Sequence, residues 1–240
     1  MTARLVVLTG TGTGIGKTHF GEALLRAAGQ AGLRAAGLKP VESGVGEGTT
    51  DAARLAAAST FHVKHEGLAF ALPVSPHLAA RAAGVALDLG PLVAWIGRVR
   101  AGADLVLVEL PGGLFSPLVA PPDGALLVNA DLAARLAPDA VALYAPDRLG
   151  VLHDVGAATR AAAGVPLRID LVVLGAPEVP DASTGTNAGE LRAIVAPPVL
   201  GPVPRGTPEE LAEGPVIRAA LAGLAGPAAA NEGPPEHRTR

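Results

Sequence analysis

A glycine-rich stretch near the start of the chain carries the residues best suited to chemistry. Residues 5–18 read LVVLTGTGTGIGKT, an apolar run followed by glycines at every second position, and an Ala/Leu-rich amphipathic segment comes next. Glycines 12, 14 and 16 allow the backbone to take positive φ and to approach an anion closely. Successive N–H groups at the start of a helix then point at a phosphate. The pattern predicts a phosphate-binding loop between a strand and a helix.

Lys17 and Thr18 follow this loop and supply a charge and a metal ligand. The Lys17 ammonium is expected to meet the β- and γ-phosphates of a nucleotide, and the Thr18 hydroxyl to bind Mg²⁺. The alternative is an ordinary glycine-rich turn in which Lys17 and Thr18 occur by chance. The predicted strand before the turn and the predicted helix after it favour the phosphate-binding loop. The residues expected to bind nucleotide here are Gly12, Thr13, Gly14, Ile15, Gly16, Lys17 and Thr18.

The spacing of the loop excludes two common variants. The strict pattern G-x-x-x-x-G-K-[ST] fails because Thr11 stands five residues before Gly16, and the glycine is Gly10, so the loop is one residue longer. The pattern G-x-G-x-x-G is also absent between Gly10 and Gly16, which disfavours dinucleotide binding.

The elements that position this loop alternate along the whole chain. Short Val/Leu runs and longer Ala/Leu/Arg segments of helical period are typical of a parallel sheet covered on both faces. The predicted strands are 5–9, 35–39, 104–110, 140–145, 171–174 and 199–203. The predicted helices are 17–31, 50–58, 76–83, 89–101, 130–136, 151–163, 189–195 and 208–224. We expect an α/β fold with a doubly wound, mostly parallel sheet of the P-loop NTPase type.

The sequence shows few domain boundaries. No linker divides residues 1–225, which we expect to form a single domain, with a loop at 175–188 that is rich in Pro, Ser, Thr and Gly. Residues 226–240 mix Pro, Gly and charge without an apolar face, and we expect a disordered tail.

Composition excludes several classes of function. The 240 residues contain no Cys, which removes disulfides, Cys zinc sites and thiol nucleophiles. One Trp, one Tyr, four Phe and a net charge of −3 provide neither stacking platforms nor a basic field, so nucleic acid is not an expected partner. No apolar window is long enough to span a membrane, and the start lacks a signal-peptide pattern, so a cytoplasmic protein is expected.

A second motif, KPVESG at residues 39–44, follows the second predicted strand. Together with the loop it resembles the dethiobiotin synthetase family, and the resemblance covers most of residues 5–204. The matching positions are Gly10, Thr11, Thr13, Gly16, Lys17 and Thr18 in the loop, Lys39, Pro40, Val41, Ser43 and Gly44 in the second motif, Thr50–Ala52, Ser75–His77, and Val108, Glu109, Gly112 and Gly113 after the third strand.

The resemblance implies a reaction and its participants. Enzymes of this family are homodimers that convert 7,8-diaminononanoate, CO₂ and ATP into dethiobiotin, ADP and phosphate. The route runs through a carbamate and a carbamic-phosphoric anhydride. The resemblance also implies catalytic roles for Lys17 and Lys39, which would clamp the γ-phosphate and the carbamate. Ser43 and Thr13 would hydrogen-bond the carbamate or the substrate amines.

The resemblance further implies a magnesium site and additional nucleotide contacts. Thr18, Asp51 and Glu109 would supply three hard oxygen ligands, with phosphates and waters completing the octahedron that Mg²⁺ prefers. Glu109, Gly112 and Gly113 are expected beside the nucleotide. In a parallel sheet these positions lie at the carboxyl ends of strands, where open α/β folds bind ligands.

Three of these side chains also have an ordinary structural explanation. A carboxylate that ends a buried strand is costly unless it meets a cation, which favours Glu109 as a ligand. Asp51 stands among cap-type residues, and capping the following helix is as good an explanation as metal binding. Lys39 is alternatively a solvated lysine at a strand end.

Several departures from the family pattern bear on chemistry. Gly12 stands where Asp or Asn is common, and Pro111, without an N–H, interrupts a Gly-Ala-Gly-Gly turn. Residues 147–154 resemble the turn whose helix receives the substrate carboxylate in the dimer, but His153 and Asp154 replace an Asn-His pair. Gly175 occupies the position of an adenine-reading Asn, which predicts weakened or altered base selectivity.

These departures keep an alternative function open. A nucleotide-binding protein on the same scaffold, with a regulatory or scaffold role and without full turnover, also fits them. A partitioning-type ATPase is disfavoured, because that class carries an additional lysine near the start of the loop and residues 10–16 contain none.

Overall fold

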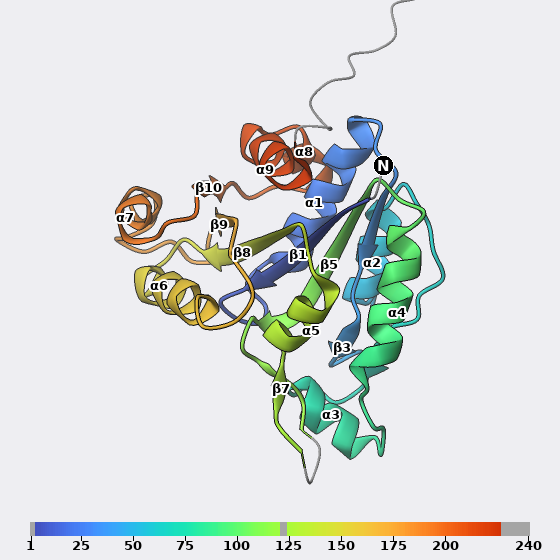
Figure 1. The fold of residues 1–240 in the computed structure, drawn as a ribbon. Coiled ribbons are helices and arrows are strands. Elements are labelled where there is room, and N and C mark those ends of the chain that lie inside the picture. Colours follow the sequence, from blue (N-terminus) through green and yellow to red (C-terminus); the bar gives the residue numbers. More distant parts are fainter. Residues whose placement is uncertain (1–2, 121–123, 227–240) are drawn as a thin grey trace, which may run out of the picture.

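The computed structural model describes residues 3–120 and 124–226 (Figure 1). Its centre is a six-stranded sheet in the order β10-β9-β8-β1-β5-β2, and every neighbouring pair is parallel. The strands are β1 (Arg4–Gly10), β2 (Ala35–Leu38), β5 (Leu105–Gly113), β8 (Ala140–Pro146), β9 (Leu171–Gly175) and β10 (Val199–Val203). All six predicted strands form, and the predicted α/β architecture is confirmed.

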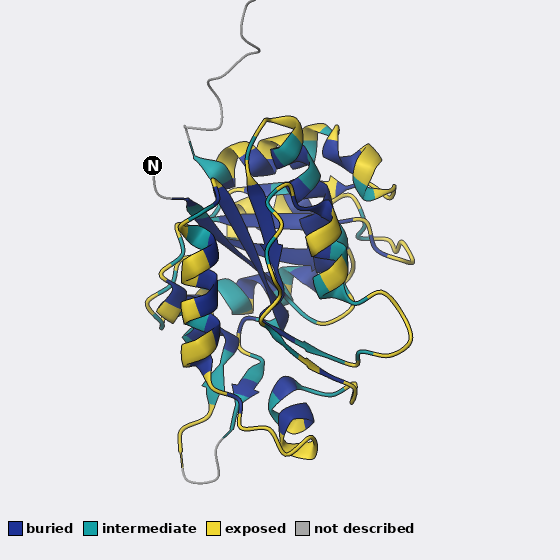
Figure 2. Ribbon diagram, turned by 90° about the vertical axis from the view of Figure 1, so that its right-hand side faces the viewer, coloured by how far each residue is buried: buried dark blue, intermediate teal, exposed yellow. Residues whose placement is uncertain are grey.

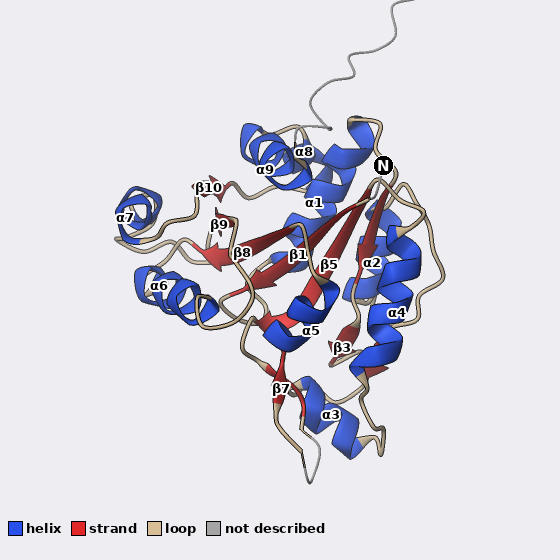
Figure 3. Ribbon diagram, in the orientation of Figure 1, coloured by secondary structure: helices blue, strands red, loops and turns tan. Residues whose placement is uncertain are grey.

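Helices cover both faces of this sheet (Figure 3). One face carries α1 (Lys17–Gln30), α2 (Asp51–Ala58), α8 (Pro208–Ala212) and α9 (Pro215–Ala225). The other carries α4 (Leu89–Arg100), α5 (Asn129–Leu136), α6 (Val151–Ala162) and α7 (Asn187–Ile194), while α3 (Pro76–Ala82) packs beside the short strands at the carboxyl edge. The first strand lies between β5 and β8, so the strand order reverses at the carboxyl end of β1, the place where such folds bind ligands.

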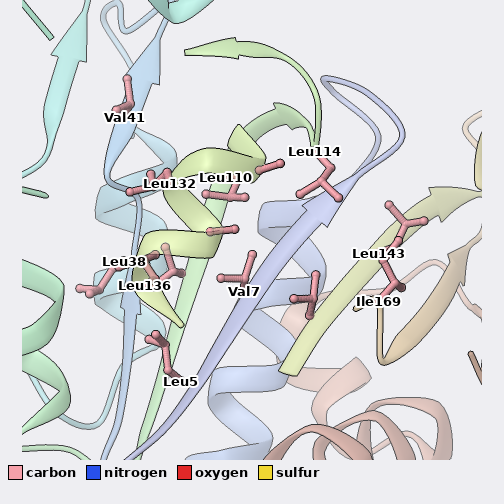
Figure 4. Packing of buried hydrophobic residues seen from close by; sticks show 14 of the residues in the cluster. Leu5, Val7, Leu38, Val41, Leu110, Leu114, Leu132, Leu136, Leu143 and Ile169 are labelled. Carbon is pink, nitrogen blue, oxygen red and sulfur yellow. The ribbon is translucent and has the colours of Figure 1, made fainter. Parts of the chain in front are cut away.

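The core follows from alternation within the buried strands. Leu5 and Val7 of β1 pack with α5 and its neighbours, whereas Val6 and Leu8 face the helices on the opposite side. Figure 4 shows the first of these clusters, and Figure 2 shows that the sheet is buried while the outer helix faces are exposed. Continuous apolar runs in the sequence are therefore strands buried on both faces.

Two predicted boundaries were wrong. The helix expected over 208–224 is divided, because α8 ends at Ala212 and α9 begins at Pro215, whose ring removes the N–H that a continuous helix would need. The loop expected over 175–188 ends earlier, because α7 begins at Asn187. Apart from Gly226, the expected disordered tail lies outside the described residues.

The sequence analysis missed two small sheets. β3 (Val41–Ser43) pairs in parallel with β4 (Leu68–Phe70), and β6 (Pro117–Val119) pairs antiparallel with β7 (Leu127–Val128). Strands of two or three residues are too short to show an alternating pattern. β3 nevertheless matters for function, since it carries the second motif onward from the end of β2.

One buried carboxylate fixes the segment between β9 and α7. Asp147, at the end of β8, is fully buried and accepts hydrogen bonds from Gly185 N at 2.8 Å and Asn187 Nδ2 at 2.7 Å. Asp181 in the same segment accepts from Leu149 N at 2.8 Å. The segment is therefore held against the turn that precedes α6.

We expect Asp147→Ala to lower the free energy of unfolding by about 2–4 kcal/mol, because the buried Asn187 amide and the backbone N–H of Gly185 lose a charged acceptor. Urea denaturation measures this change, and Glu178→Ala, at an exposed position of the same segment, is the control that should lie within about 0.5 kcal/mol of the parent chain. Equal stabilities for the two variants would contradict the assigned role of Asp147.

Among the helices of the described residues, none is long and apolar enough to cross a membrane.

Candidate active site

The carboxyl ends of β1, β2 and β5 surround a cavity of about 620 Å³. It gathers residues that are far apart in the sequence. Of the predicted site residues, the cavity is lined by Thr13, Gly14, Gly16, Lys17, Thr18, Lys39, Ser43, Asp51, Glu109 and Gly112. Gly12 and Gly113 are not among its lining residues, and Ile15 lines a neighbouring cavity instead.

The glycine-rich loop has the expected backbone in part. Gly14 and Gly16 have φ of 69° and 102°, and Gly16 precedes the first turn of α1 without a side-chain cap. Gly12 does not take a positive φ, contrary to the prediction, and a Cβ there would meet only Ile15 Cγ2 at 3.9 Å. A positive φ therefore requires glycine at two of the three predicted positions, Gly14 and Gly16.

Lys17 lies across the loop that precedes it. Its Nζ donates to the Gly12 carbonyl at 2.6 Å, and the residue is only 5% exposed. Burial lowers the pKa of Lys17 to about 8, although the carboxylate of Glu109 opposes that shift. A phosphate beside this ammonium would supply the negative charge that the protein provides only partly.

Glu109, at the end of β5, is the centre of the charged cluster. Its Oε1 accepts from Lys39 Nζ at 2.5 Å and from the Thr18 hydroxyl at 3.0 Å, and the residue is 1% exposed. Lys39 Nζ also donates to Asp51 Oδ2 at 2.9 Å. Lys39 is therefore buried and ion-paired, which excludes the solvated lysine.

The pKa values of the cluster reflect burial opposed by ion pairing. Burial raises the pKa of Glu109, and the Lys39 ammonium offsets this only in part. Burial lowers the pKa of Lys39, but the carboxylates of Glu109 and Asp51 outweigh it and the net shift is upward. For Asp51, burial acts upward and the ammonium of Lys39 prevails, so its pKa is lowered.

The oxygen atoms of this cluster fit a hard cation. Glu109 Oε2 is buried and has no hydrogen-bond partner among the described residues, an arrangement that is costly without a positive ligand. Thr18 and Asp51 lie in the same cavity. Within residues 3–120 and 124–226, no group of three or more His, Cys, Asp or Glu side chains is placed to hold a metal. Two carboxylates and one hydroxyl suit Mg²⁺, which keeps waters and substrate phosphates as its other ligands.

The side chain of Asp51 does not cap α2, so only the capping explanation is excluded and metal binding stays a prediction. The hydroxyl of Thr50 accepts from Ala53 N at 3.1 Å, and the Glu42 carboxylate accepts from Asp51 N at 2.7 Å and Ala52 N at 3.2 Å. The Asp51 side chain is thereby left to Lys39. Glu42 is a positioning residue that the sequence analysis missed, because its contact crosses a loop and has no helical spacing.

A second missed residue supports the turn after Glu109. Asn129 is fully buried, and its Nδ2 donates to the carbonyls of Pro111 at 2.5 Å and Gly113 at 2.8 Å. The Ser116 hydroxyl accepts from Gly113 N at 3.0 Å. The turn is thus held through the carbonyls of Pro111 and Gly113 and the N–H of Gly113, and none of these contacts needs an N–H at position 111.

Ser43 enters the cavity from β3. Its hydroxyl donates to the carbonyl of Val74 at 2.7 Å. Thr13 is exposed at the opposite side of the loop, and its Oγ1 lies 3.4 Å from the position that a Cβ on Gly112 would occupy. Both hydroxyls are therefore placed where a substrate in the cavity would meet them.

A second cavity, of about 290 Å³, lies on the other side of Gly16. It is lined by Ile15, Gly16, His19, Phe20, Tyr144, Ala176, Val203, Pro204, Arg205 and Gly206. Gly16 and His19 border both cavities. Tyr144 is 6% exposed, and its ring lies 5.3 Å from that of Phe20.

Burial raises the pKa of Tyr144 to about 12, and the chain contains no other tyrosine. We therefore expect the absorbance of tyrosinate to appear near pH 12 in the folded protein rather than near 10. Because the folded pKa is raised, this group's contribution to stability is present below pH 10 and is lost as the pH rises towards 12, by up to about 3 kcal/mol. A titration midpoint near 10 before unfolding would contradict the burial of this hydroxyl.

The fold and the cavity define a class of protein. A glycine-rich turn after the central strand, followed by a buried lysine and a threonine whose hydroxyl meets a carboxylate on the next strand, is the phosphate site of P-loop nucleotide-binding proteins. Residues 4–208 match the family described as an AAA domain. The chain is thus a P-loop protein with a parallel doubly wound sheet.

Solved structures support the same fold. A ParA family ATPase from Chlorobium tepidum has a TM-score of 0.54 at 11% identity, over 93% of this chain and 95% of that one. The septum site-determining protein MinD from Pyrococcus horikoshii has a TM-score of 0.55 at 16% identity, over 94% and 95%. At these identities the likeness concerns the fold alone.

Sequence relatives define the family more narrowly. The ATP-dependent dethiobiotin synthetase BioD of Ralstonia nicotianae is 38% identical over 206 residues, which cover 82% of this chain and 87% of that protein. The protein of the same name from Rhodococcus jostii is 35% identical over 206 residues, with coverages of 85% and 87%. The chain belongs to the dethiobiotin synthetase family.

Proposed function

We propose that the chain is an ATP-dependent cyclo-ligase that converts 7,8-diaminononanoate and CO₂ into dethiobiotin, with release of ADP and phosphate. The single observation that carries this proposal is the buried cluster around Glu109. It joins a phosphate-loop hydroxyl and a second lysine to one carboxylate, whose other oxygen has no partner in the described residues. Family membership supplies the identity of the reaction.

The chain's own side chains divide the work between two substrates. Lys17, on the loop, binds the γ-phosphate, and Lys39, at the end of β2, neutralises the carbamate that forms on one substrate amine. Ser43 and Thr13 donate to or accept from the carbamate and the amines. A carbamate oxygen attacks the γ-phosphorus of ATP and ADP leaves. The second amine then attacks the carbonyl carbon of the resulting carbamic-phosphoric anhydride, loses a proton to solvent and closes the ring as phosphate leaves. Phosphoryl transfer needs positioning and charge neutralisation more than an acid or a base, and this cluster provides both.

Thr18, Asp51 and Glu109 are the residues that would hold Mg²⁺. When bound, the ion neutralises charge on the transferring phosphoryl group. The loop amides from Gly12 to Gly16, together with Gly112 and Gly113, are the backbone groups proposed to contact the nucleotide. Of these residues, Gly14, Gly16 and Gly112 line the cavity directly.

The working unit under this proposal is a cytoplasmic homodimer formed by residues 1–225 as one domain. Support comes from the family resemblance and from two exposed apolar side chains, Leu149 just before α6 and Val179 between β9 and α7, which are 75% and 77% exposed. The α6 N-terminus follows Gly150, whose φ is 96°, and has no side-chain cap, which suits an anion, whereas Asp154 in its first turn adds an opposing negative charge. Sedimentation analysis tests the dimer directly.

The deciding experiment incubates purified protein with diaminononanoate, bicarbonate and Mg·ATP. Formation of dethiobiotin with stoichiometric phosphate release is the expected result. Nucleotide binding without dethiobiotin would instead support the regulatory or scaffold alternative. Failure to bind Mg·ATP would overturn both.

A further inference from the structure

Tyr144 and Gly175 occupy adjoining positions that exclude larger side chains. A Cβ built on Gly175 would lie 1.7 Å from Tyr144 Oη and 2.4 Å from Cζ. No real Cβ tolerates such a distance, so the tyrosine ring fills the space where a side chain at position 175 would stand. With Tyr144 in this position only glycine fits at position 175, so the two residues are sterically coupled at the carboxyl ends of β8 and β9.

The Tyr144 hydroxyl is placed beside the phosphate loop. A Cβ on Gly16 would lie 3.4 Å from Tyr144 Oη, and Gly16 ends the loop that leads into α1. Among the described residues, no side chain or backbone group pairs with this hydroxyl by a hydrogen bond. A neutral hydroxyl that both donates and accepts is thus available at the wall of the second cavity.

The second cavity is suited to a nucleobase. It adjoins the phosphate-binding cavity, because Gly16 and His19 line both, so it lies within reach of a nucleotide whose phosphates bind the loop. Ile15, Phe20 and Val203 provide apolar walls, and Arg205 contributes a polar group at the rim. A flat, partly apolar ring with polar edges matches this lining.

We propose that the Tyr144 hydroxyl contacts the edge of the nucleobase, and that it does so in place of any side chain at position 175. This inference rests on the proposed nucleotide site and deepens it. Tyr144 is therefore the residue that adds affinity for the base, whereas Lys17 and the loop bind the phosphates of any nucleotide. The contact with Tyr144 thus gives a physical reason for the altered base selectivity that Gly175 predicts.

The first test compares Tyr144→Phe with the parent chain by calorimetry, using Mg·ATP and Mg·tripolyphosphate as ligands. The variant retains the ring and loses only the hydroxyl. We expect ATP to bind about three- to tenfold more weakly, the loss of one hydrogen bond, while tripolyphosphate binds unchanged. Unchanged ATP affinity, or an equal loss for both ligands, would overturn the proposal.

The second test exchanges the two positions. Gly175→Asn alone places a side chain into the tyrosine ring, and we expect a loss of ATP affinity of tenfold or more. Tyr144→Ala with Gly175→Asn removes the overlap, and ATP affinity should return to within about threefold of the parent value. Additive losses in the double variant would show that the two positions do not form one unit.

A spectroscopic measurement distinguishes a failure of the Tyr144 contact from a failure of the proposed nucleotide site. Because Tyr144 is the only tyrosine, a ¹³C label at the tyrosine ring gives a single resonance. Mg·ATP should shift it and Mg·tripolyphosphate should not. If neither ligand binds, the nucleotide site itself fails. If both bind and neither shifts the resonance, the site stands and the role of Tyr144 is refuted.

Discussion

Lys17→Ala is expected to abolish measurable binding of Mg·ATP and to lower kcat/KM by about 10²–10³-fold. A loss of this size follows when one pre-positioned charge is removed from a phosphoryl-transfer site. The ammonium is 5% exposed, and it lies against the loop carbonyl of Gly12 rather than in an ion pair with a carboxylate. Its removal therefore takes charge from the nucleotide, while Glu109 keeps its hydrogen-bonded ion pair with Lys39 and loses only the longer-range attraction of Lys17.

The stability of the same variant provides the discriminating control. Burial, not ion pairing, dominates the pKa of Lys17, so alanine should change the free energy of unfolding without nucleotide by less than about 1 kcal/mol. Lys64→Ala, at an exposed lysine, should match the parent chain in both binding and stability. If Lys17→Ala retained full Mg·ATP affinity, the phosphate site would have to lie elsewhere.

Lys39→Met is expected to destabilise the fold by about 3–5 kcal/mol and to stop dethiobiotin formation. Methionine fills much of the same volume, but it leaves the Glu109 carboxylate buried without its closest cation. Adding Glu109→Gln removes the uncompensated charge, so the double variant should recover at least half of the lost stability while remaining inactive. Chemical denaturation of the two single variants, the double variant and the parent measures this coupling.

A matched pair on the surface provides the control for this cycle. Arg98 and Glu66 form an ion pair at the same separation of 2.5 Å, but their side chains are 60% and 42% exposed. Arg98→Met should therefore cost less than about 1 kcal/mol. Equal costs for Lys39→Met and Arg98→Met would mean that burial of the Lys39–Glu109 pair has no energetic consequence.

The sequence predicts those parts of the site in which a residue's role depends only on its neighbours along the chain. The positive φ of Gly14 and Gly16 and the helix that follows Lys17 are encoded within a few residues. The prediction fails for Gly12, because glycine content alone does not say which peptide must turn. It also misses β3, whose three residues show no period.

Contacts across the chain account for the residues that the sequence analysis did not find. Glu42 binds backbone N–H groups nine and ten residues away, and Asn129 holds a turn more than fifteen residues before it. For Asp51 the structure excludes helix capping, because the N–H groups at the start of α2 bind Thr50 and Glu42, and it shows an ion pair with Lys39 that no local pattern predicts. Each of these assignments depends on which segments the sheet order brings together.

The sequence by itself determined the alternation of buried strands and amphipathic helices, the phosphate loop and the motifs that place the chain in its family, since all of these depend on spacing over a few residues. Only the tertiary structure decided that Lys39, Thr18 and Glu109 share one buried cluster, and that the Tyr144 ring fills the space at Gly175. The buried ion pairs and the overlap between Tyr144 and position 175 both involve residues far apart in the chain. These residues meet only after the parallel strands have brought their carboxyl ends to one edge of the sheet.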